Sequence, residues 1–230
     1  MSKRLYVGVG ALLLGAFALA CNDASGNKDE TSIRFINASP NGPAMTALLD
    51  GAIIEANVTY ATASPYQIVH EDGKTIQLRN SVTDATLFNQ DVSLEHERFY
   101  TEIATGNLST LGSLFVQDNR DAPPAGQAFF RFIHVAPSMP AGLDIYVTDA
   151  NADISNLSPT ITNVVYLTAS AYVTIPGATY RVRVTATGTK TVLIDDSNVA
   201  IPASGARTML SLDNPGGGPP FSTLLLTDQS

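Results

Sequence analysis

The 230-residue sequence contains no tryptophan, one cysteine and three histidines. The single cysteine, Cys21, excludes an internal disulfide and any metal site built from several cysteines. The histidines His70, His96 and His134 are not spaced to chelate a metal, and we expect each of them to be a solvent-facing strand residue. These absences disfavour disulfide-stabilised folds and histidine or cysteine metal centres.

Basic residues are also scarce, at 13 Lys and Arg against 21 Asp and Glu, for a net charge of −8. A surface of this sign repels phosphate backbones, so we expect no nucleic-acid partner. The sequence has no Gly-x-Ser-x-Gly elbow for a nucleophilic serine. His96-Glu97 begins like a zinc-protease motif, but Tyr100 stands where that motif needs its second histidine. We therefore predict that the protein is not an enzyme.

The N-terminal segment has the layout of a secretory signal. Lys3 and Arg4 precede an uncharged apolar run of 16 residues, 5–20, which is shorter than the roughly 20 residues of a membrane-spanning helix. Small residues and Leu19 lie just before Cys21. The stretch resembles a bacterial lipoprotein signal, in which the cysteine becomes the new N-terminus and carries fatty acids such as palmitate. An uncleaved anchor is the alternative.

This resemblance implies lipidation at Cys21 and contact with a membrane through the lipid, because two or three acyl chains give stable anchoring. Residues 1–20 would be the lipoprotein signal peptide, and the polar residues 21–31 a lipidated, flexible tether. Asn22 after the cysteine favours the outer membrane over retention at the inner one. We therefore predict a lipid-anchored location in the bacterial cell envelope.

The remainder of the chain predicts an all-β fold, since short β-branched or aromatic runs alternate with turn residues and a helical period is rarely sustained. One segment, 53–60, is ambiguous between strand and helical turn. Alternation at period two around Tyr180 places Arg181 and Arg183 on a face that we expect to be solvent-exposed. In the first half the predicted strands cover residues 33–37, 45–49, 66–69, 75–79, 85–92, 99–104 and 111–117.

The second half repeats the first. Arg34-Phe35-Ile36-Asn37-Ala38-Ser39-Pro40 recurs 97 positions later as Arg131-Phe132-Ile133-His134-Val135-Ala136-Pro137. We predict two tandem immunoglobulin-like β-sandwich domains, at residues 32–118 and 128–230, joined by the proline-containing linker 119–127. Small barrels are the alternative.

The repeated phrases, continued through Pro43-Ala44 and Pro140-Ala141, resemble the domain of unknown function 4397 family. The family pattern continues with an aspartate and an alternating apolar and tyrosine strand, as in Leu143-Asp144-Ile145-Tyr146-Val147, whereas the first repeat has Thr46 in place of the aspartate. The resemblance implies an exported, mostly β domain, and it implies no catalytic residue, cofactor or substrate.

The segment from Asp149 to Ser155 presents oxygen ligands at alternate positions, as the first half of a calcium loop does. Its candidate metal ligands are Asp149, Asn151 and Asp153. Ile154 stands where such loops need glycine, and Thr160 where they need glutamate, which favours a plain polar loop. No other cofactor is indicated.

Tyr66 and Tyr172 correspond between the repeats. They are candidates either for a sugar-binding platform or for buried tyrosines whose hydroxyls tie strands together, and we favour the second interpretation. The sequence thus predicts a non-enzymatic, lipid-anchored envelope protein with a structural or partner-binding role, the partner being an unidentified envelope protein or glycan. The alternative is a carbohydrate- or calcium-binding surface module.

Overall fold

The computed structural model describes residues 31–229, so the predicted lipidation site Cys21 lies outside the described part. These residues form 18 β-strands and one short 3-10 turn, Leu108–Thr110. Within this range no helix is long and apolar enough to cross a bilayer. The prediction of an all-β chain is confirmed.

The first half of the chain forms two sheets. Their strand orders are β4-β1-β8-β9, with β5 also paired to β1, and β3-β2-β6-β7. Strands β1 and β8 run parallel, and the other paired strands are antiparallel. The strands are β1 Thr31–Asn37, β2 Met45–Leu49, β3 Ala52–Val58, β4 Thr62–Ala63, β5 Gln67–Val69, β6 Thr75–Asn80, β7 Thr86–Asp91, β8 Phe99–Thr105 and β9 Gly112–Asp118.

The second half repeats this topology strand for strand. Its sheets have the orders β13-β10-β17-β18, with β14 also paired to β10, and β12-β11-β15-β16. The strands are β10 Gln127–His134, β11 Gly142–Thr148, β12 Ile161–Val165, β13 Thr168–Ala169, β14 Val173–Pro176, β15 Ala178–Ala186, β16 Val192–Ile201, β17 Ala206–Leu212 and β18 Ser222–Gln229.

The predicted pair of β-sandwiches is confirmed. Each sandwich places its first and second strands in different sheets, whereas a constant immunoglobulin domain keeps them in one, so the likeness is one of architecture. The ambiguous segment 53–60 contains strand β3 rather than a helical turn. Its pattern was unclear because β3 is a largely exposed edge strand with register shifts against β2 and a positive φ at Asn57.

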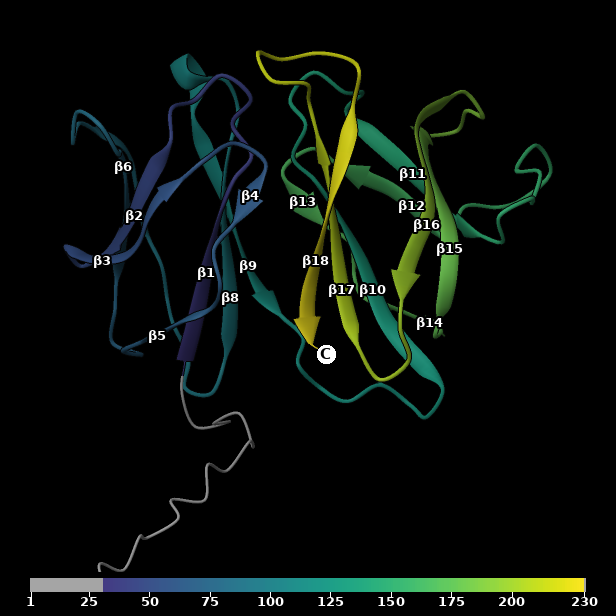
Figure 1. The fold of residues 1–230 in the computed structure, drawn as a ribbon, viewed down its shortest axis with the longest axis horizontal. Coiled ribbons are helices and arrows are strands. Elements are labelled where there is room, and N and C mark those ends of the chain that lie inside the picture. Colours follow the sequence, from purple (N-terminus) through teal and green to yellow (C-terminus); the bar gives the residue numbers. More distant parts are fainter. Residues whose placement is uncertain (1–30, 230) are drawn as a thin grey trace, which may run out of the picture.

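The four sheets stand side by side in Figure 1. We call the β1 and β10 sheets the inner sheets, because they face each other at the centre. Along β1, Ile33 and Phe35 point into the core of the first sandwich, while Ile36 points toward the second sandwich. Alternate residues of β1 therefore face either the core of the first sandwich or the contact between the two sandwiches, which we call the joint.

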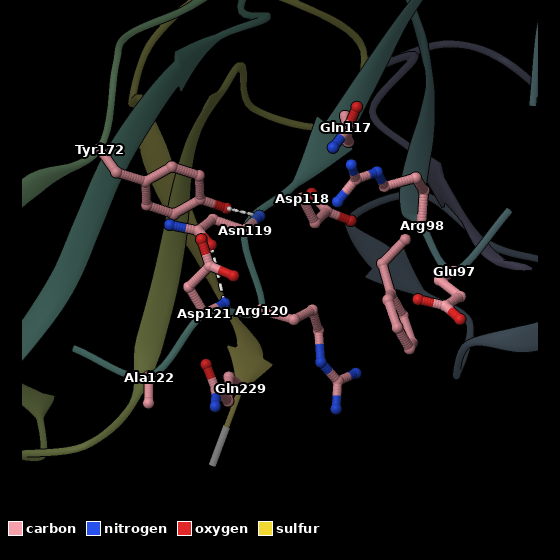
Figure 2. Close-up of a pocket in the computed structure, with 11 residues that line it drawn as sticks. Glu97, Arg98, Gln117, Asp118, Asn119, Arg120, Asp121, Ala122, Tyr172 and Gln229 are labelled. Atoms are coloured by element: carbon pink, nitrogen blue, oxygen red, sulfur yellow. Dashed lines mark hydrogen bonds between the residues drawn. The ribbon is translucent and has the colours of Figure 1, made fainter. Parts of the chain in front are cut away.

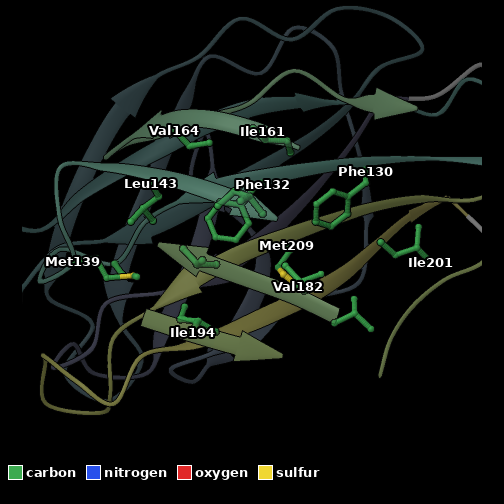
Figure 3. Packing of buried hydrophobic residues seen from close by; sticks show 14 of the residues in the cluster. Phe130, Phe132, Met139, Leu143, Ile161, Val164, Val182, Ile194, Ile201 and Met209 are labelled. Carbon is green, nitrogen blue, oxygen red and sulfur yellow. The ribbon is translucent and has the colours of Figure 1, made fainter. Parts of the chain in front are cut away.

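Three apolar clusters stabilise the molecule. One fills each sandwich, and Figure 3 shows that of the second around Phe130, Phe132 and Met209. The third joins the inner sheets and contains buried residues from both sandwiches. Its fully or nearly buried members are Ile36, Ala38, Ile103, Ile133, Val135, Leu210, Leu212 and Leu226.

The prediction that Arg183 faces solvent is wrong, since it is only 6% exposed and donates to the Thr148 hydroxyl at 2.7 Å. Alternation placed it correctly on the outer face of the β11 sheet. That face is partly covered, however, because Ile154 of the β11–β12 loop is buried and Lys190 donates to the Leu157 carbonyl of the same loop. A covering loop leaves no periodic signal in the sequence.

Glu102 on β8 is a buried carboxyl in the first sandwich, at 1% exposure. It pairs with Phe35 across the sheet, as Met209 pairs with the equivalent Phe132, so methionine occupies the same place in the second sandwich. Gln90 donates to Oε2 at 2.9 Å, and Oε1 has no hydrogen-bond partner among residues 31–229. Burial raises the pKa of Glu102 to about 7.

We predict that Glu102→Met removes a pH-dependent loss of stability. Between the ordinary pKa of glutamate and about 7, the folded state holds a proton that the unfolded state has released, so the stability contributed by Glu102 falls as pH rises. The loss amounts to about 3 kcal/mol by pH 8. Urea denaturation at pH 5 and pH 8 should show a smaller decline in the variant, with exposed Glu95→Gln as control. An unchanged decline would contradict this.

Candidate functional site

Arg34 on β1 is buried between the inner sheets, at 3% exposure. Its Nε donates to the Thr101 hydroxyl at 2.8 Å within its own sandwich. Its Nη1 donates to the Thr227 carbonyl at 3.1 Å, and its Nη2 to Oδ1 of Asp228 at 2.5 Å. The arginine of the repeated phrase therefore binds the last strand of the other sandwich.

Arg131 on β10 makes the same set of contacts in the opposite direction. Its Nε donates to the Thr208 hydroxyl at 2.7 Å, and its Nη1 to the Gln117 carbonyl at 2.9 Å. Its Nη2 is ion-paired with Asp118, which ends the last strand of the first sandwich. Each sandwich thus contributes one arginine and one aspartate to the joint.

Each aspartate is also held by its own sandwich. Oδ2 of Asp118 accepts the Thr101 hydroxyl at 2.5 Å and the Tyr66 hydroxyl at 2.7 Å. In the second sandwich Oδ2 of Asp228 accepts the hydroxyls of Thr208 at 2.6 Å and Tyr172 at 2.8 Å. We call these residues the arginine–aspartate cluster: Arg34, Tyr66, Thr101, Asp118, Arg131, Tyr172, Thr208 and Asp228.

Burial and the neighbouring aspartates keep Tyr66 and Tyr172 protonated, and the aspartates also keep Arg34 protonated. Burial alone would lower the pKa of Arg34, but nearby Tyr66, Asp118 and Asp228 raise it above its ordinary value. Burial raises the pKa of Tyr66 and of Tyr172, and the aspartates add to that rise. The tyrosines therefore act as hydrogen-bond donors at neutral pH.

These contacts support the interpretation that the Tyr66 and Tyr172 hydroxyls tie strands together, although both residues are half-buried rather than buried. The guanidinium carbon of Arg34 lies 4.7 Å from the ring centroid of Tyr66, and that of Arg131 lies 4.6 Å from that of Tyr172. One face of each ring is thus covered by a cation. The covered faces are not free to stack on a sugar, and of the two tyrosines Tyr172 alone also lines the pocket described below.

The fourth residue of the repeated phrase also has a structural role. The Asn37 amide donates to the Pro43 carbonyl at 3.0 Å, and the equivalent His134 donates from Nε2 to the Pro140 carbonyl at 2.9 Å. The prediction that His134 faces solvent is wrong, because it is fully buried and burial lowers its pKa. His134 shares the face of Phe132, which points into the core of the second sandwich, and there its ring nitrogens are within hydrogen-bond distance of Ser211 and Pro140.

A pocket of about 500 Å³ opens beside the arginine–aspartate cluster. Figure 2 shows Glu97 and Arg98 on one side, Tyr172 and Asn119 on the other, and Arg120 between them. The wall therefore comes from both sandwiches and from the segment that joins them. The lining residues are Glu97, Arg98, Phe99, Gln117, Asp118, Asn119, Arg120, Asp121, Ala122, Tyr172 and Gln229.

Arg120 is the cation in the pocket that sequence reasoning missed. Its guanidinium carbon lies 4.1 Å from the ring centroid of Phe99, and among residues 31–229 it makes no salt bridge. The signal in the sequence was weak: Arg120 follows Asp118 by two positions, where the correspondence between the repeats has ended. An arginine held on an aromatic ring is a pre-positioned donor for a polar ligand.

The calcium candidates Asp149, Asn151 and Asp153 lie in the exposed β11–β12 loop. Both carboxylate oxygens of Asp153 accept hydrogen bonds from Ser155, at 2.9 Å from its backbone NH and 2.6 Å from its hydroxyl. These bonds lower the pKa of Asp153. Within residues 31–229 no group of three or more His, Cys, Asp or Glu side chains is placed to share a metal ion.

Comparison with known proteins identifies one family. The family model described as "Domain of unknown function (DUF4397)" matches residues 31–146, which run from β1 into β11. No curated protein matches the chain. A solved structure similar to this chain is CBMbc (family CBM26) from Eubacterium rectale Amy13K in complex with maltoheptaose, at 11% identity and a TM-score of 0.28 over 87% of this chain and 98% of that one. A TM-score of this size has no bearing on the ligand of this chain.

We predict that Arg34→Ala destabilises the fold by about 3–5 kcal/mol, because it leaves Asp228 buried without its guanidinium partner. The matched control is Arg79→Ala. Arg79 pairs with Asp84 at 3.3 Å on the surface, so its loss should cost about 1 kcal/mol or less. Equal losses for the two variants in urea denaturation would show that the buried pair has no special role.

Proposed function

The chain belongs to the DUF4397 family, and we propose that it is a non-enzymatic protein of the bacterial cell envelope, anchored by lipid at Cys21. Its two sandwiches are tandem copies of one domain, and it binds a partner in the pocket at their joint. In this function the repeated phrases at residues 34–40 and 131–137 have a structural role, and the residues that differ between the repeats bind the partner.

The pocket beside the arginine–aspartate cluster is the observation that carries the binding role. Its volume of about 500 Å³ lies within the range of small-ligand sites. Its lining residues include Asp118, whose fully buried carboxylate is fixed by Thr101, Tyr66 and Arg131. A wall held in this way loses little conformational freedom on binding, which favours affinity.

The anchoring role rests on the sequence before residue 31 and on the place where the fold begins. The Thr31 hydroxyl donates to the Glu95 carbonyl at 2.7 Å, and the Ser32 NH donates to the Arg98 carbonyl at 2.9 Å. A tether from Cys21 would therefore enter the fold beside the pocket. Ten extended residues span at most about 35 Å, so an anchored chain would hold the pocket close to the membrane surface.

The second candidate is a carbohydrate-binding module that uses the same pocket. Amide side chains of Gln117, Asn119 and Gln229 line it together with Asp121. The amides donate to and accept from vicinal hydroxyls, and the carboxylate accepts from them. A calcium-binding role through Asp149, Asn151 and Asp153 would instead require the Asp153 oxygens to leave Ser155.

We predict that Cys21→Ser abolishes incorporation of labelled fatty acid and releases the protein from the membrane fraction. The thiol is the acyl acceptor that the lipoprotein-like signal provides, and serine would not replace it there. Metabolic labelling followed by fractionation measures both effects. Persistence of the label in the serine variant would refute anchoring at Cys21.

We predict that Arg120→Ala weakens capture of the partner from intact envelopes by about tenfold, the loss expected for one charge-assisted contact of about 1.4 kcal/mol. Arg79→Ala, on the outer face of the first sandwich, is the matched control and should capture as the natural chain does. Mass spectrometry of the captured material separates an envelope protein from a glycan. Equal recovery of the partner with Arg120→Ala and Arg79→Ala would show that the partner does not bind in the pocket.

A further inference from the structure

The joint between the sandwiches is reciprocal down to individual atoms. In each arginine, Nε binds a threonine of its own sandwich, Nη1 a backbone carbonyl of the other, and Nη2 the aspartate that follows that carbonyl. The arginine bonds to threonine and to backbone carbonyl, and the aspartate bonds to threonine and tyrosine, differ in length by 0.2 Å or less between the two sandwiches. A contact in which the same surface patch serves both partners is isologous, as in a two-fold dimer.

The apolar part of the joint follows the same symmetry. Most equivalent positions carry apolar residues in both sandwiches, and the exception is the buried Leu212, which corresponds to Thr105. None of these positions pairs an apolar residue with a charged one, so both sandwiches present a largely apolar surface to the joint. The equivalent pairs are Ile36 with Ile133, Ala38 with Val135, Ile103 with Leu210, Leu114 with Leu224, and Val116 with Leu226.

Each sandwich presents both an arginine and an aspartate on the face that contacts the other sandwich. Arg34 Nη2 lies 2.5 Å from Asp228 of the other sandwich and only 3.7 Å from Asp118 of its own. The four charges therefore form one compact cluster on the pseudo-two-fold axis. A face that bears an arginine and an aspartate in this arrangement is complementary to another copy of itself.

We propose that this face is a pairing surface for a second copy of the same chain. In the paired form, two chains exchange halves. The first sandwich of each chain packs on the second sandwich of the other chain through the same arginine–aspartate cluster. Every contact of the joint is kept, and only the connecting segment 119–126 changes its path. The short connecting segment keeps the two sandwiches of one chain at a high effective concentration relative to each other. At low protein concentration the chain therefore closes on itself, and at high protein concentration two chains exchange halves.

The experiment uses two full-length Cys21→Ser chains that differ only in an affinity tag. They are unfolded together in urea, refolded by dilution at several protein concentrations, and passed over both tag resins in turn. Mixed dimers are expected, and a tenfold higher chain concentration should raise the dimer-to-monomer ratio about tenfold. Recovery of monomers alone at every concentration overturns the proposal.

Two further measurements identify the contact in the dimer. Hydrogen exchange of β1 and β10 should be as slow in the mixed dimer as in the monomer, because the joint is complete in both; fast exchange there overturns the proposal. The variant Arg34→Asp with Arg131→Asp places four carboxylates at the joint, and it should form no mixed dimers. Mixed dimers that persist in this variant would assign the association to another surface.

Discussion

The exchange of one arginine and one aspartate between the sandwiches is the interaction on which the rest of this molecule depends. Asp118 and Asp228 are buried, and an unpaired carboxylate there would cost several kcal/mol. Each of them is held by hydroxyls of its own sandwich and by the arginine of the other. Separating the sandwiches would therefore strand both charges, so the joint, rather than the prolines of the connecting segment, fixes how the two halves sit.

The far end of the molecule adds a second set of contacts between the halves. The Tyr60 hydroxyl donates to the Asp213 carbonyl at 2.6 Å, and the Gly216 NH donates to the Pro40 carbonyl at 2.7 Å. The Thr105 hydroxyl donates to the Val135 carbonyl at 2.6 Å. The glycine-rich β17–β18 hairpin tip thus packs on the first sandwich, and the apolar cluster between the inner sheets is closed at both ends.

Much of the fold could be predicted because strand alternation and internal repetition are local properties. Period two separates Phe35 from Arg34 and so defines two faces, and the recurrence of Tyr66 as Tyr172 identified residues with the same role. What faces Arg34 could not be predicted, since Asp228 lies 194 positions away and a single strand pattern carries no information about its partner. The covering of Arg183 by a loop is hidden for the same reason, and Arg120 belongs to no motif, whereas His134 lies on the core face of Phe132 and was assigned to solvent only because it is polar.

The pocket lies where the symmetry of the joint breaks down. Phe99 pairs with Ser32, and the equivalent pair in the second sandwich is Ala206 with Phe129, so Phe99 and Arg98 correspond to Ala206 and Gly205. The second sandwich therefore has neither a ring nor a cation at these two positions, and its ring against Tyr172 comes instead from Phe129 on β10. Arg98, Phe99 and Arg120 differ from their counterparts in the other repeat and lie around one pocket, so the binding role proposed for that pocket would draw its specificity from side chains found in only one repeat.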